Sequence, residues 1–214
     1  MRNLVLVGNS HAGRECYHIF KDMLEHDCAL RGTIRFKGFL SHNGYRGNLG
    51  KLAEFLLGSD NEYAMESNDY FSICIGDNRI RREIYENLNA RGAKFFTLLS
   101  PFARVSRDIV LGNANIVGYG CAFSCDIRVG NANYFNSQVT LGHDVLIGDY
   151  NFLAYQATLL GGTRIGSGNH FGPRSLLLDR GRVGDNNRIA PGAFLYKGCG
   201  NERFMAGNPA LPVT

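Results

Sequence analysis

Apolar residues recur at every sixth position along the second half of the chain. The run has no gap and comprises Val105, Leu111, Val117, Phe123, Val129, Phe135, Leu141, Ile147, Leu153, Leu159, Ile165, Phe171, Leu177, Val183, Ile189 and Leu195. Neither an α-helix nor an ordinary strand has a period of six. A hexapeptide repeat of this kind indicates a parallel β-helix, in which three hexads make one triangular coil. Sixteen hexads therefore predict a little over five coils of 18 residues.

A second period, at 18 residues, supports this interpretation. It aligns five asparagines at one corner of successive coils: Asn115, Asn133, Asn151, Asn169 and Asn187. Stacked amide side chains can form hydrogen bonds along the stack. Because Gly and Asn tolerate positive φ, we also expect the Gly and Asn columns to supply the tight corners.

The first half of the chain alternates between strand-like and helix-like patterns. We predict strands over 3–7, 33–40, 70–75 and 94–98, and helices over 14–26, 51–57 and 79–90, the last capped by Asp77 or Asn78. This alternation predicts an α/β Rossmann-like domain with a small parallel sheet. The expected division is an acceptor-binding domain over 1–99, a β-helix over 100–196 and a capping tail over 197–214.

Three loops of the predicted sheet are candidates for binding a ligand, because ligands bind beyond the carboxyl ends of parallel strands. The candidate residues are Gly8, Ser10, His11, Gly13, Ser41, His42, Asp77 and Asn78. The first loop offers a helix N-terminus to an anion, although a βα turn without a ligand fits the same spacing. Only Gly8 and Gly13 match the three-glycine dinucleotide fingerprint, which disfavours NAD and a Rossmann oxidoreductase.

Composition excludes several classes of protein. The net charge is only +4 and the basic residues are interspersed with acids, so we expect no nucleic-acid partner. No apolar run approaches the roughly 20 residues that span a bilayer, and the first residues do not resemble a signal peptide. The six cysteines lack metal-ligand spacing. These features predict a cytoplasmic protein with reduced, buried thiols, no membrane association and no metal.

One histidine of the repeat has the surroundings of a general base. His143 is followed by Asp144, and a carboxylate can orient an imidazole for proton transfer near neutral pH. One coil further on, the position is Gly161, which is followed by Gly162. A glycine there leaves room for a substrate and presents an N–H to an oxyanion. The alternative for a lone histidine is a solvated corner residue, which is how we interpret His170.

With these motifs in place, the chain resembles the hexapeptide-repeat acyltransferases, and among them the branch similar to sialic-acid O-acetyltransferases and sugar-nucleotide N-acetyltransferases. The resemblance rests on the glycine-containing first turn, ICIGDNRIRREIY, the repeat with LGHDVLIG, and AGNPA near the end. It implies a left-handed β-helix and a homotrimer that uses acetyl-CoA without a metal.

The resemblance also implies residue roles. His143 would deprotonate the acceptor, Asp144 would orient it, and the amide of Gly161 would face the thioester carbonyl. The coenzyme would lie between adjacent β-helices, near Gly162, Gly207 and Pro209. Phe152 and Tyr155 are expected at the interface beside this groove.

The chain departs from the family pattern at several positions. Ser41 and His42 replace an acidic pair of the relatives that use uridine nucleotides, which disfavours a UDP-linked acceptor. Phe152 replaces a second family histidine. The tail lacks the usual basic residues, so we expect the coenzyme phosphates to use other cations: Arg174, Arg180, Arg188 or Lys197.

The leading hypothesis is an acetyl-CoA-dependent N-acetyltransferase that acts on an amino sugar, nucleotide-linked, in bacterial surface-glycan biosynthesis. An O-acetyltransferase of sialic acid or a related sugar is the first alternative, since one base serves both acceptors. A non-catalytic β-helix that binds or scaffolds other molecules is an alternative of another class.

Overall fold

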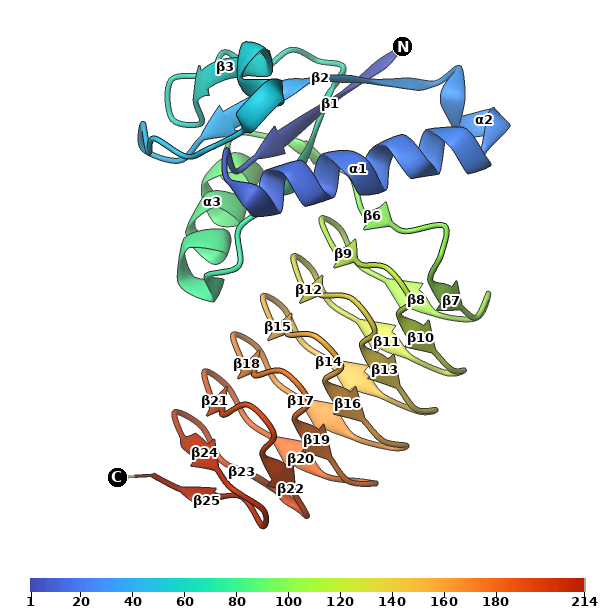
Figure 1. The fold of residues 1–214 in the computed structure, drawn as a ribbon, viewed down its shortest axis with the longest axis vertical. Helices are drawn as coiled ribbons and strands as arrows, with labels where there is room; N and C mark the ends of the chain where they lie inside the picture. Colours follow the sequence, from blue (N-terminus) through green and yellow to red (C-terminus); the bar gives the residue numbers. More distant parts are fainter. Residues whose placement is uncertain (214) are drawn as a thin grey trace.

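Residues 2–95 form an α/β part built on a five-stranded sheet in the computed structural model, which describes residues 1–213 (Figure 1). The strands are β1 (Arg2–Val7), β2 (Ile34–Ser41), β3 (Leu56–Ser59), β4 (Asp69–Ile73) and β5 (Lys94–Phe95). They lie in the order β3-β2-β1-β4-β5 and all pair in parallel. The predicted small parallel sheet is confirmed.

Four helical segments connect these strands: α1 (His11–His26), α2 (Cys28–Arg31), the 3-10 helix η1 (Gly50–Phe55) and α3 (Asn78–Ala90). Asp77 is the N-cap of α3, because its carboxylate accepts hydrogen bonds from the amides of Arg79 and Ile80. The prediction had left Asp77 and Asn78 as alternatives for this cap.

Two of the predicted elements were wrong in extent. The helix expected over 51–57 is a 3-10 turn that ends at Phe55, because Leu56 and the residues after it extend as β3 and pair with β2. The strand expected over 94–98 is two short strands. Its first residues form β5, whereas β6 (Leu98–Leu99) pairs with β9 of the second part, where the Leu98 amide donates to the Asn115 carbonyl.

The second part is a parallel β-helix whose strands each end on one of the predicted apolar positions. These strands are β7 (Arg104–Val105), β8 (Val110–Leu111), β9 (Ile116–Val117), β10 (Ala122–Phe123), β11 (Arg128–Val129), β12 (Tyr134–Phe135), β13 (Thr140–Leu141), β14 (Leu146–Ile147), β15 (Phe152–Leu153), β16 (Thr158–Leu159), β17 (Arg164–Ile165), β18 (His170–Phe171), β19 (Leu176–Leu177), β20 (Arg182–Val183), β21 (Arg188–Ile189) and β22 (Phe194–Leu195). Each pairs with strands one coil away, and the second residue of each strand packs into one apolar core.

The strands stack into three sheets, which form the three faces of the triangular coil (Figure 1). We name them by strands they contain: the β13 sheet, the β14 sheet and the β15 sheet. The chain visits them in that order within each coil. Consequently, the corner between the β13 and β14 sheets lies opposite the β15 sheet.

The asparagine ladder predicted from the 18-residue period is confirmed. Asn133, Asn151 and Asn169 are completely buried. The Asn151 side-chain amide donates to the Asn133 side-chain oxygen at 3.0 Å, and its own oxygen accepts from the Asn169 backbone amide at 2.8 Å. The ladder therefore satisfies backbone and side-chain groups that the core would otherwise leave unpaired.

The expectation that the Gly and Asn columns supply positive φ was wrong. The residue before each ladder asparagine carries it instead, as at Ala132 with φ 50° and Tyr150 with φ 60°. The glycine column has a different reason: a Cβ at Gly148 would lie 2.7 Å from the Gly166 carbonyl oxygen of the next coil. Stacked coils approach too closely there for a side chain.

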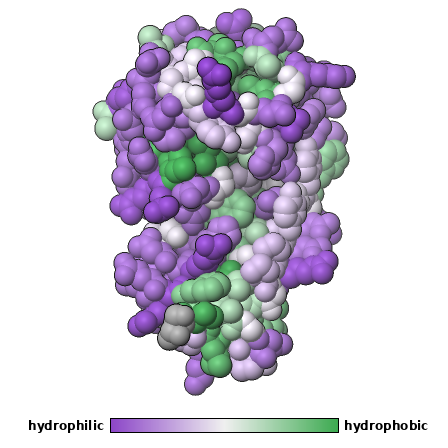
Figure 2. Space-filling view, turned by 60° about the vertical axis from the view of Figure 1, so that its left-hand side comes forward, coloured by the Kyte–Doolittle hydropathy of each residue, from purple (hydrophilic) through white to green (hydrophobic). Residues whose placement is uncertain are grey.

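The segment after residue 196 was expected to be an irregular tail, but it continues the sheets. β23 (Gly198–Cys199) extends the β14 sheet, and β24 (Phe204–Ala206) extends the β15 sheet. β25 (Leu211–Pro212) pairs antiparallel with β24. At this end of the molecule apolar side chains reach the surface, among them Phe204 and Leu211 (Figure 2).

The two parts share apolar clusters. α1 lies between the sheet and the β-helix (Figure 1), and its Ile19 and Phe20 belong to one cluster with Ile116 and Tyr134 of the coils. α3 belongs to a second cluster that includes Ala132. The cysteines follow the prediction only in part. Cys16, Cys74 and Cys121 are buried, whereas Cys28 and Cys125 are exposed.

Candidate functional site

His143 and Asp144 form a dyad at the corner between the β13 and β14 sheets. The His143 Nδ1 atom lies 2.7 Å from the Asp144 Oδ2 atom, and both side chains are about two-thirds exposed, at 63% and 66%. Asp144 sits at φ 57°, which turns its carboxylate back toward the preceding ring. With Nδ1 held by the carboxylate, Nε2 is the ring atom that remains for a proton transfer.

The His143 ring lies directly over Gly161. A Cβ at Gly161 would be 2.6 Å from Nε2 and 2.7 Å from Cε1 of that ring, so any larger residue would displace the imidazole. The amide of Gly162 donates to the His143 carbonyl at 2.8 Å and fixes the two coils against each other. No acceptor for the Gly161 amide lies among residues 1–213. The neighbours expected from the 18-residue coil are therefore in contact.

A cavity of about 800 Å³ lies between the α/β part and the β15 sheet. Its lining residues come from the loop after β4, the start of α3, the outer face of β15, β18 and β21, and the coil corners beside these strands. They are Gly76, Asp77, Asn78, Arg79, Phe152, Gly168, His170, Asn186, Asn187, Arg188 and Glu202. The candidates Asp77 and Asn78 are thus part of a concave site, as ligand sites generally are. Phe152 forms its floor rather than lying beside His143 in the same chain.

Sequence reasoning missed the role of His170 in this cavity. Its ring stacks on Phe152 with centroids 4.9 Å apart and planes 15° apart. Burial, together with the charges of Arg188 and Arg81, lowers the pKa of His170 below its ordinary value. The 18-residue period could have predicted this contact, since Phe152 and His170 are one coil apart at the same outward-facing position.

The other two candidate loops do not line this cavity. A Cβ at Gly8 would lie 2.6 Å from the Cys74 carbonyl oxygen, and Gly13 packs against the Gly8 carbonyl, so both glycines permit close packing of the first turn. Ser10 is the N-cap of α1 without a side-chain hydrogen bond, and His11 is exposed.

The groups after β2 are engaged within the protein. Ser41 Oγ donates to the Gly58 carbonyl at 3.1 Å. His42 Nδ1 lies 2.8 Å from the Asp60 carboxylate, and His42 Nε2 lies 2.9 Å from the Asn43 amide nitrogen. Both ring nitrogens of His42 therefore already have partners.

The C-terminal candidates lie at the far end of the β13 sheet. Gly207 and Pro209 are exposed, and the Gly207 carbonyl accepts from the amide of Phe194 in β22. Three pairings along this sheet separate β13 from β22. Tyr155, at the corner after β15, is 47% exposed and so is accessible to another molecule.

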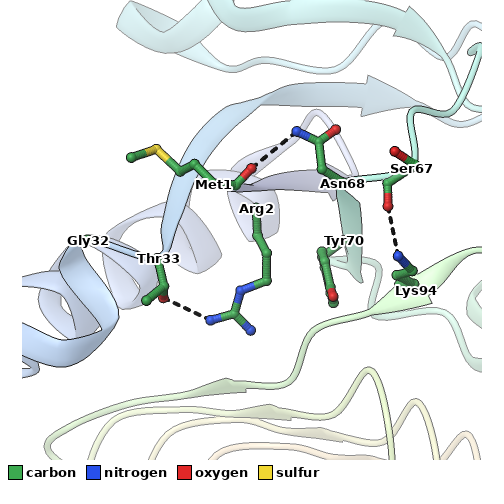
Figure 3. A pocket seen from close by; sticks show the side chains of 8 residues that line it. All are labelled: Met1, Arg2, Gly32, Thr33, Ser67, Asn68, Tyr70 and Lys94. Carbon is green, nitrogen blue, oxygen red and sulfur yellow. Dashed lines mark hydrogen bonds between the residues drawn. The ribbon is translucent and has the colours of Figure 1, made fainter.

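A second hollow, of about 430 Å³, lies at the amino ends of the strands (Figure 3). Arg2 and Lys94 lie 5.5 Å and 5.7 Å from the ring centroid of Tyr70. Arg2 also donates to Thr33 Oγ1, and Lys94 donates to the Ser67 carbonyl. Both cations therefore already have hydrogen-bond partners within the protein. The hollow also lies at the edge of the sheet opposite the loops where ligands are expected.

Among residues 1–213, no three His, Cys, Asp or Glu side chains are grouped as metal ligands. None of the helices in this range is both long and apolar enough to cross a membrane.

Comparison with solved structures places the whole chain in one group of folds. The acetyltransferase domain of PglB from Neisseria gonorrhoeae FA1090 matches with a TM-score of 0.85 and 24% identity over all of both chains. PerB from Caulobacter crescentus, solved with CoA and GDP-perosamine, matches with a TM-score of 0.85 and 17% identity over 100% of this chain and 98% of PerB. WeeI from Acinetobacter baumannii AYE matches with a TM-score of 0.83 and 18% identity over all of both chains.

These likenesses show that the chain has the fold of this group, an α/β part joined to a parallel β-helix. The PglB domain has also been solved with acetyl coenzyme A. No protein-family model and no curated protein sequence matches the chain.

Proposed function

We propose that this protein is an acetyl-CoA-dependent N-acetyltransferase whose acceptor is an amino sugar, nucleotide-linked, used in bacterial surface-glycan synthesis. The observation that carries the proposal is the His143–Asp144 dyad packed over Gly161 at a coil corner. The fold that surrounds it is shared with PglB, described as an acetyltransferase domain, and with PerB, solved with CoA and a nucleotide-linked sugar. Transfer of an acetyl group to an amino sugar fits both the His143–Asp144 dyad and the shared fold.

The proposed reaction is a direct transfer. His143 Nε2 takes a proton from the acceptor amine as its nitrogen attacks the thioester carbonyl carbon. The carbonyl oxygen becomes an oxyanion that the Gly161 amide stabilises. The intermediate then collapses, the C–S bond breaks, and CoA leaves as a thiol with the proton that Nε2 held. Asp144 keeps Nδ1 protonated throughout, so that Nε2 remains the basic atom.

The cavity beside Phe152 is the proposed acceptor site. Asp77, Asn78, His170 and Arg188 supply polar groups, and the Phe152 ring supplies an apolar surface for a sugar face. We also propose that the nucleotide is bound by residues of the first two loops: Gly8, Ser10, His11, Gly13, Ser41 and His42.

The proposal extends to the architecture. It includes a left-handed coil, a Rossmann-like domain over residues 1–99, a β-helix that ends at residue 196, and a cytoplasmic location.

Arg180 is the best placed of the four cations suggested for the coenzyme phosphates. It follows Gly162 by one coil at the corner of His143, and its Cγ would be 3.3 Å from a Cβ at Gly162. Arg174 instead donates to the Gln156 side chain at another corner, and Arg188 lines the acceptor cavity. The exposed Gly207 and Pro209 at the end of the β13 sheet would complete this groove.

The geometry of one chain supports a homotrimer. His143 lies at the corner opposite the β15 sheet, whereas the acceptor cavity lies on that sheet. Six extended residues span at most about 20 Å, so this corner and the opposite face are on the order of 15 Å apart. We therefore propose that the base meets an acceptor held by another copy. A contact between different surfaces of neighbouring copies gives a closed ring when the rotation between copies allows it, and the proposed ring has three copies.

The decisive experiment compares wild type with His143→Ala, using acetyl-CoA and a panel of UDP-, GDP-, dTDP- and CMP-linked amino sugars, with free sialic acid as the O-acetylation control. We expect transfer to amino sugars to fall by roughly 10²- to 10⁴-fold in the variant. Since His143 is exposed, the variant should unfold like wild type. Full transfer by His143→Ala, or transfer to sialic acid alone, would overturn the proposal.

Mixing two inactive variants tests the shared site. His143→Ala keeps the cavity, and Gly76→Leu keeps the base but fills the cavity against Phe152, which lies 3.4 Å from a Cβ at Gly76. After random reassembly of trimers, about a quarter of the sites would combine an intact cavity with an intact base. Light scattering that shows a monomer at micromolar concentration, or no recovery of activity on mixing, would contradict the trimer.

A further inference from the structure

Arg81 in α3 is completely buried, and none of the ion pairs among residues 1–213 involves it. Its guanidinium donates instead to carbonyl oxygens. The Nε atom donates to Ala132 at 2.8 Å, Nη2 to Tyr150 and Asn151 at 2.9 Å each, and Nη1 to Ile75 at 2.8 Å. A buried cation costs free energy unless its donors are satisfied, and here all three guanidinium nitrogens donate hydrogen bonds.

Asn78, one turn earlier on α3, continues the same pattern. Its side-chain amide donates to the carbonyls of Gly168 at 2.9 Å and Asn169 at 2.8 Å, and its oxygen accepts from Arg81 Nη2 at 3.1 Å. Ala132, Tyr150 and Gly168 occupy the same corner position in three successive coils, each with positive φ. Two side chains from the first turn of one helix therefore contact three coils in order.

These contacts also hold the roof of the acceptor cavity. Arg81 Nη1 donates to the carbonyl of Gly76 at 3.1 Å, and Gly76 packs over Phe152. Apolar contacts between the two parts are non-directional. A coil column presents a similar surface about every 4.8 Å along its axis. Hydrogen bonds to individual carbonyls are therefore what distinguish one height on the column from the next.

Resting on the proposed function, we propose that Arg81 is a positioning residue. Together with Asn78 it fixes the acceptor cavity at one height along the coil column, so that the bound amine lies level with His143 of the neighbouring copy. Arg81 touches neither the acceptor nor acetyl-CoA. It acts through the segment Gly76–Asn78, which it ties to the coils.

The test uses the full chain with Arg81→Lys and Arg81→Met, and Arg82→Met as the matched control. Arg82 is a neighbour on the same helix and is 56% exposed, and it pairs with Glu86 across one helical turn. Its guanidinium lies 5.5 Å from the centroid of the Tyr150 ring but donates no hydrogen bond to a coil carbonyl among residues 1–213. Hydrogen exchange over residues 76–80 measures how firmly Arg81 and Asn78 hold this segment to the coils, an arrangement that we call the clamp. Steady-state kinetics with an amino-sugar nucleotide and acetyl-CoA measure the positioning of the acceptor. Lysine keeps the charge but has one nitrogen with three donors, so it cannot replace the six hydrogen bonds that the three guanidinium nitrogens make.

In both Arg81 variants we expect exchange of residues 76–80 to be at least about tenfold faster, because their anchoring bonds are lost. We expect kcat/KM for the acceptor to fall on the order of 100-fold through misplacement, with KM for acetyl-CoA within about twofold of wild type. Arg82→Met should change neither. If Arg81→Met does not fold, Arg81→Lys and Asn78→Ala carry the exchange measurement.

Normal exchange in folded Arg81→Lys would overturn the clamp. Faster exchange with equal losses for both substrates would overturn the positioning role, since a general loss of structure affects both. If wild type itself transfers no acetyl group, the proposed function fails while the exchange measurement still decides whether the clamp exists.

Discussion

The β-helix and the α/β part are both built on parallel strands, yet they satisfy their buried polar groups in different ways. In the β-helix, each buried asparagine bonds to the one above and the one below, so that Asn133, Asn151 and Asn169 form one continuous chain. In the α/β part, the buried Asn3 has separate partners, Asp69 and Arg35. The asparagine ladder repeats every 18 residues along the sequence, whereas the contacts of Asn3 occur at one place in the fold only.

The difference matters for the site. At the His143 corner, Gly161 of the same chain lies one coil away from the proposed base, so local stacking builds the geometry. The cavity beside Phe152 has walls from both parts, and Arg81 and Asn78 join these parts through hydrogen bonds to residues about 50 to 90 positions away in sequence. The proposed base therefore lies on the regular part, whereas the cavity forms where the two parts meet.

After His143→Ala, the largest expected effect comes from Gly161→Ala. The new methyl group would occupy the place of the His143 ring, so transfer should fall by roughly 10²- to 10³-fold as the base and the oxyanion donor separate. Because the ring is exposed and can move aside, the thermal midpoint should change little. Gly200→Ala is the control, since nothing lies within 4 Å of a Cβ there. Unchanged acetyl transfer by Gly161→Ala would remove this corner from the mechanism.

Substituting one buried asparagine in each part tests whether the ladder contributes more stability than separate hydrogen bonds do. Asn151→Ala should lower the free energy of unfolding by about 3 kcal/mol, because it leaves the Asn169 amide and the Gly166 carbonyl buried without a partner. Asn3→Ala should cost about 1 to 2 kcal/mol, since Asp69 retains Lys37 and Tyr63 as donors. Urea unfolding followed by circular dichroism measures both. Equal losses would show that the ladder adds nothing beyond its individual bonds.

Asp144→Asn separates orientation of the base from the base itself. Asparagine tolerates the φ of 57° at this position, so the corner should keep its shape. An amide orients the imidazole less well and does not stabilise its charged form, so we expect kcat to fall by about 10- to 100-fold. Transfer at the wild-type rate over the whole pH range would exclude a role for the carboxylate.

The smallest effect is a pH dependence of stability at the cavity. Burial lowers the pKa of His170 in the folded protein below its ordinary value of 6.5. The unfolded chain therefore takes up the proton first as pH falls, and stability that is present above 6.5 is lost as pH falls through the folded value. His170→Gln should flatten this part of the profile. Identical profiles for wild type and variant, measured by urea unfolding between pH 5 and pH 8, would contradict it.

The accuracy of the sequence interpretation follows the same division between the two parts. The six-residue period located every strand from β7 to β22, and the 18-residue period placed Gly161 against His143. It did not reveal which residue of the corner takes positive φ, because Ala132 and Tyr150 carry no compositional signal for that conformation. In the α/β part the main strands were found, but β3 and β6 were missed because distant partners determine them.

The sequence by itself determined the coil, its register and the contact between His143 and Gly161, since residues one repeat apart along the chain become neighbours in space. Only the tertiary structure decided which loops meet the β-helix. Of the three predicted loops, only the one at Gly76–Asn78 lines the cavity, where Phe152 and His170 face it. The physical reason is the burial of Arg81. Its Nη1 atom donates to the nearby carbonyls of Ile75 and Gly76. Its Nε and Nη2 atoms donate to carbonyls of coils about 50 and 70 residues further along the chain.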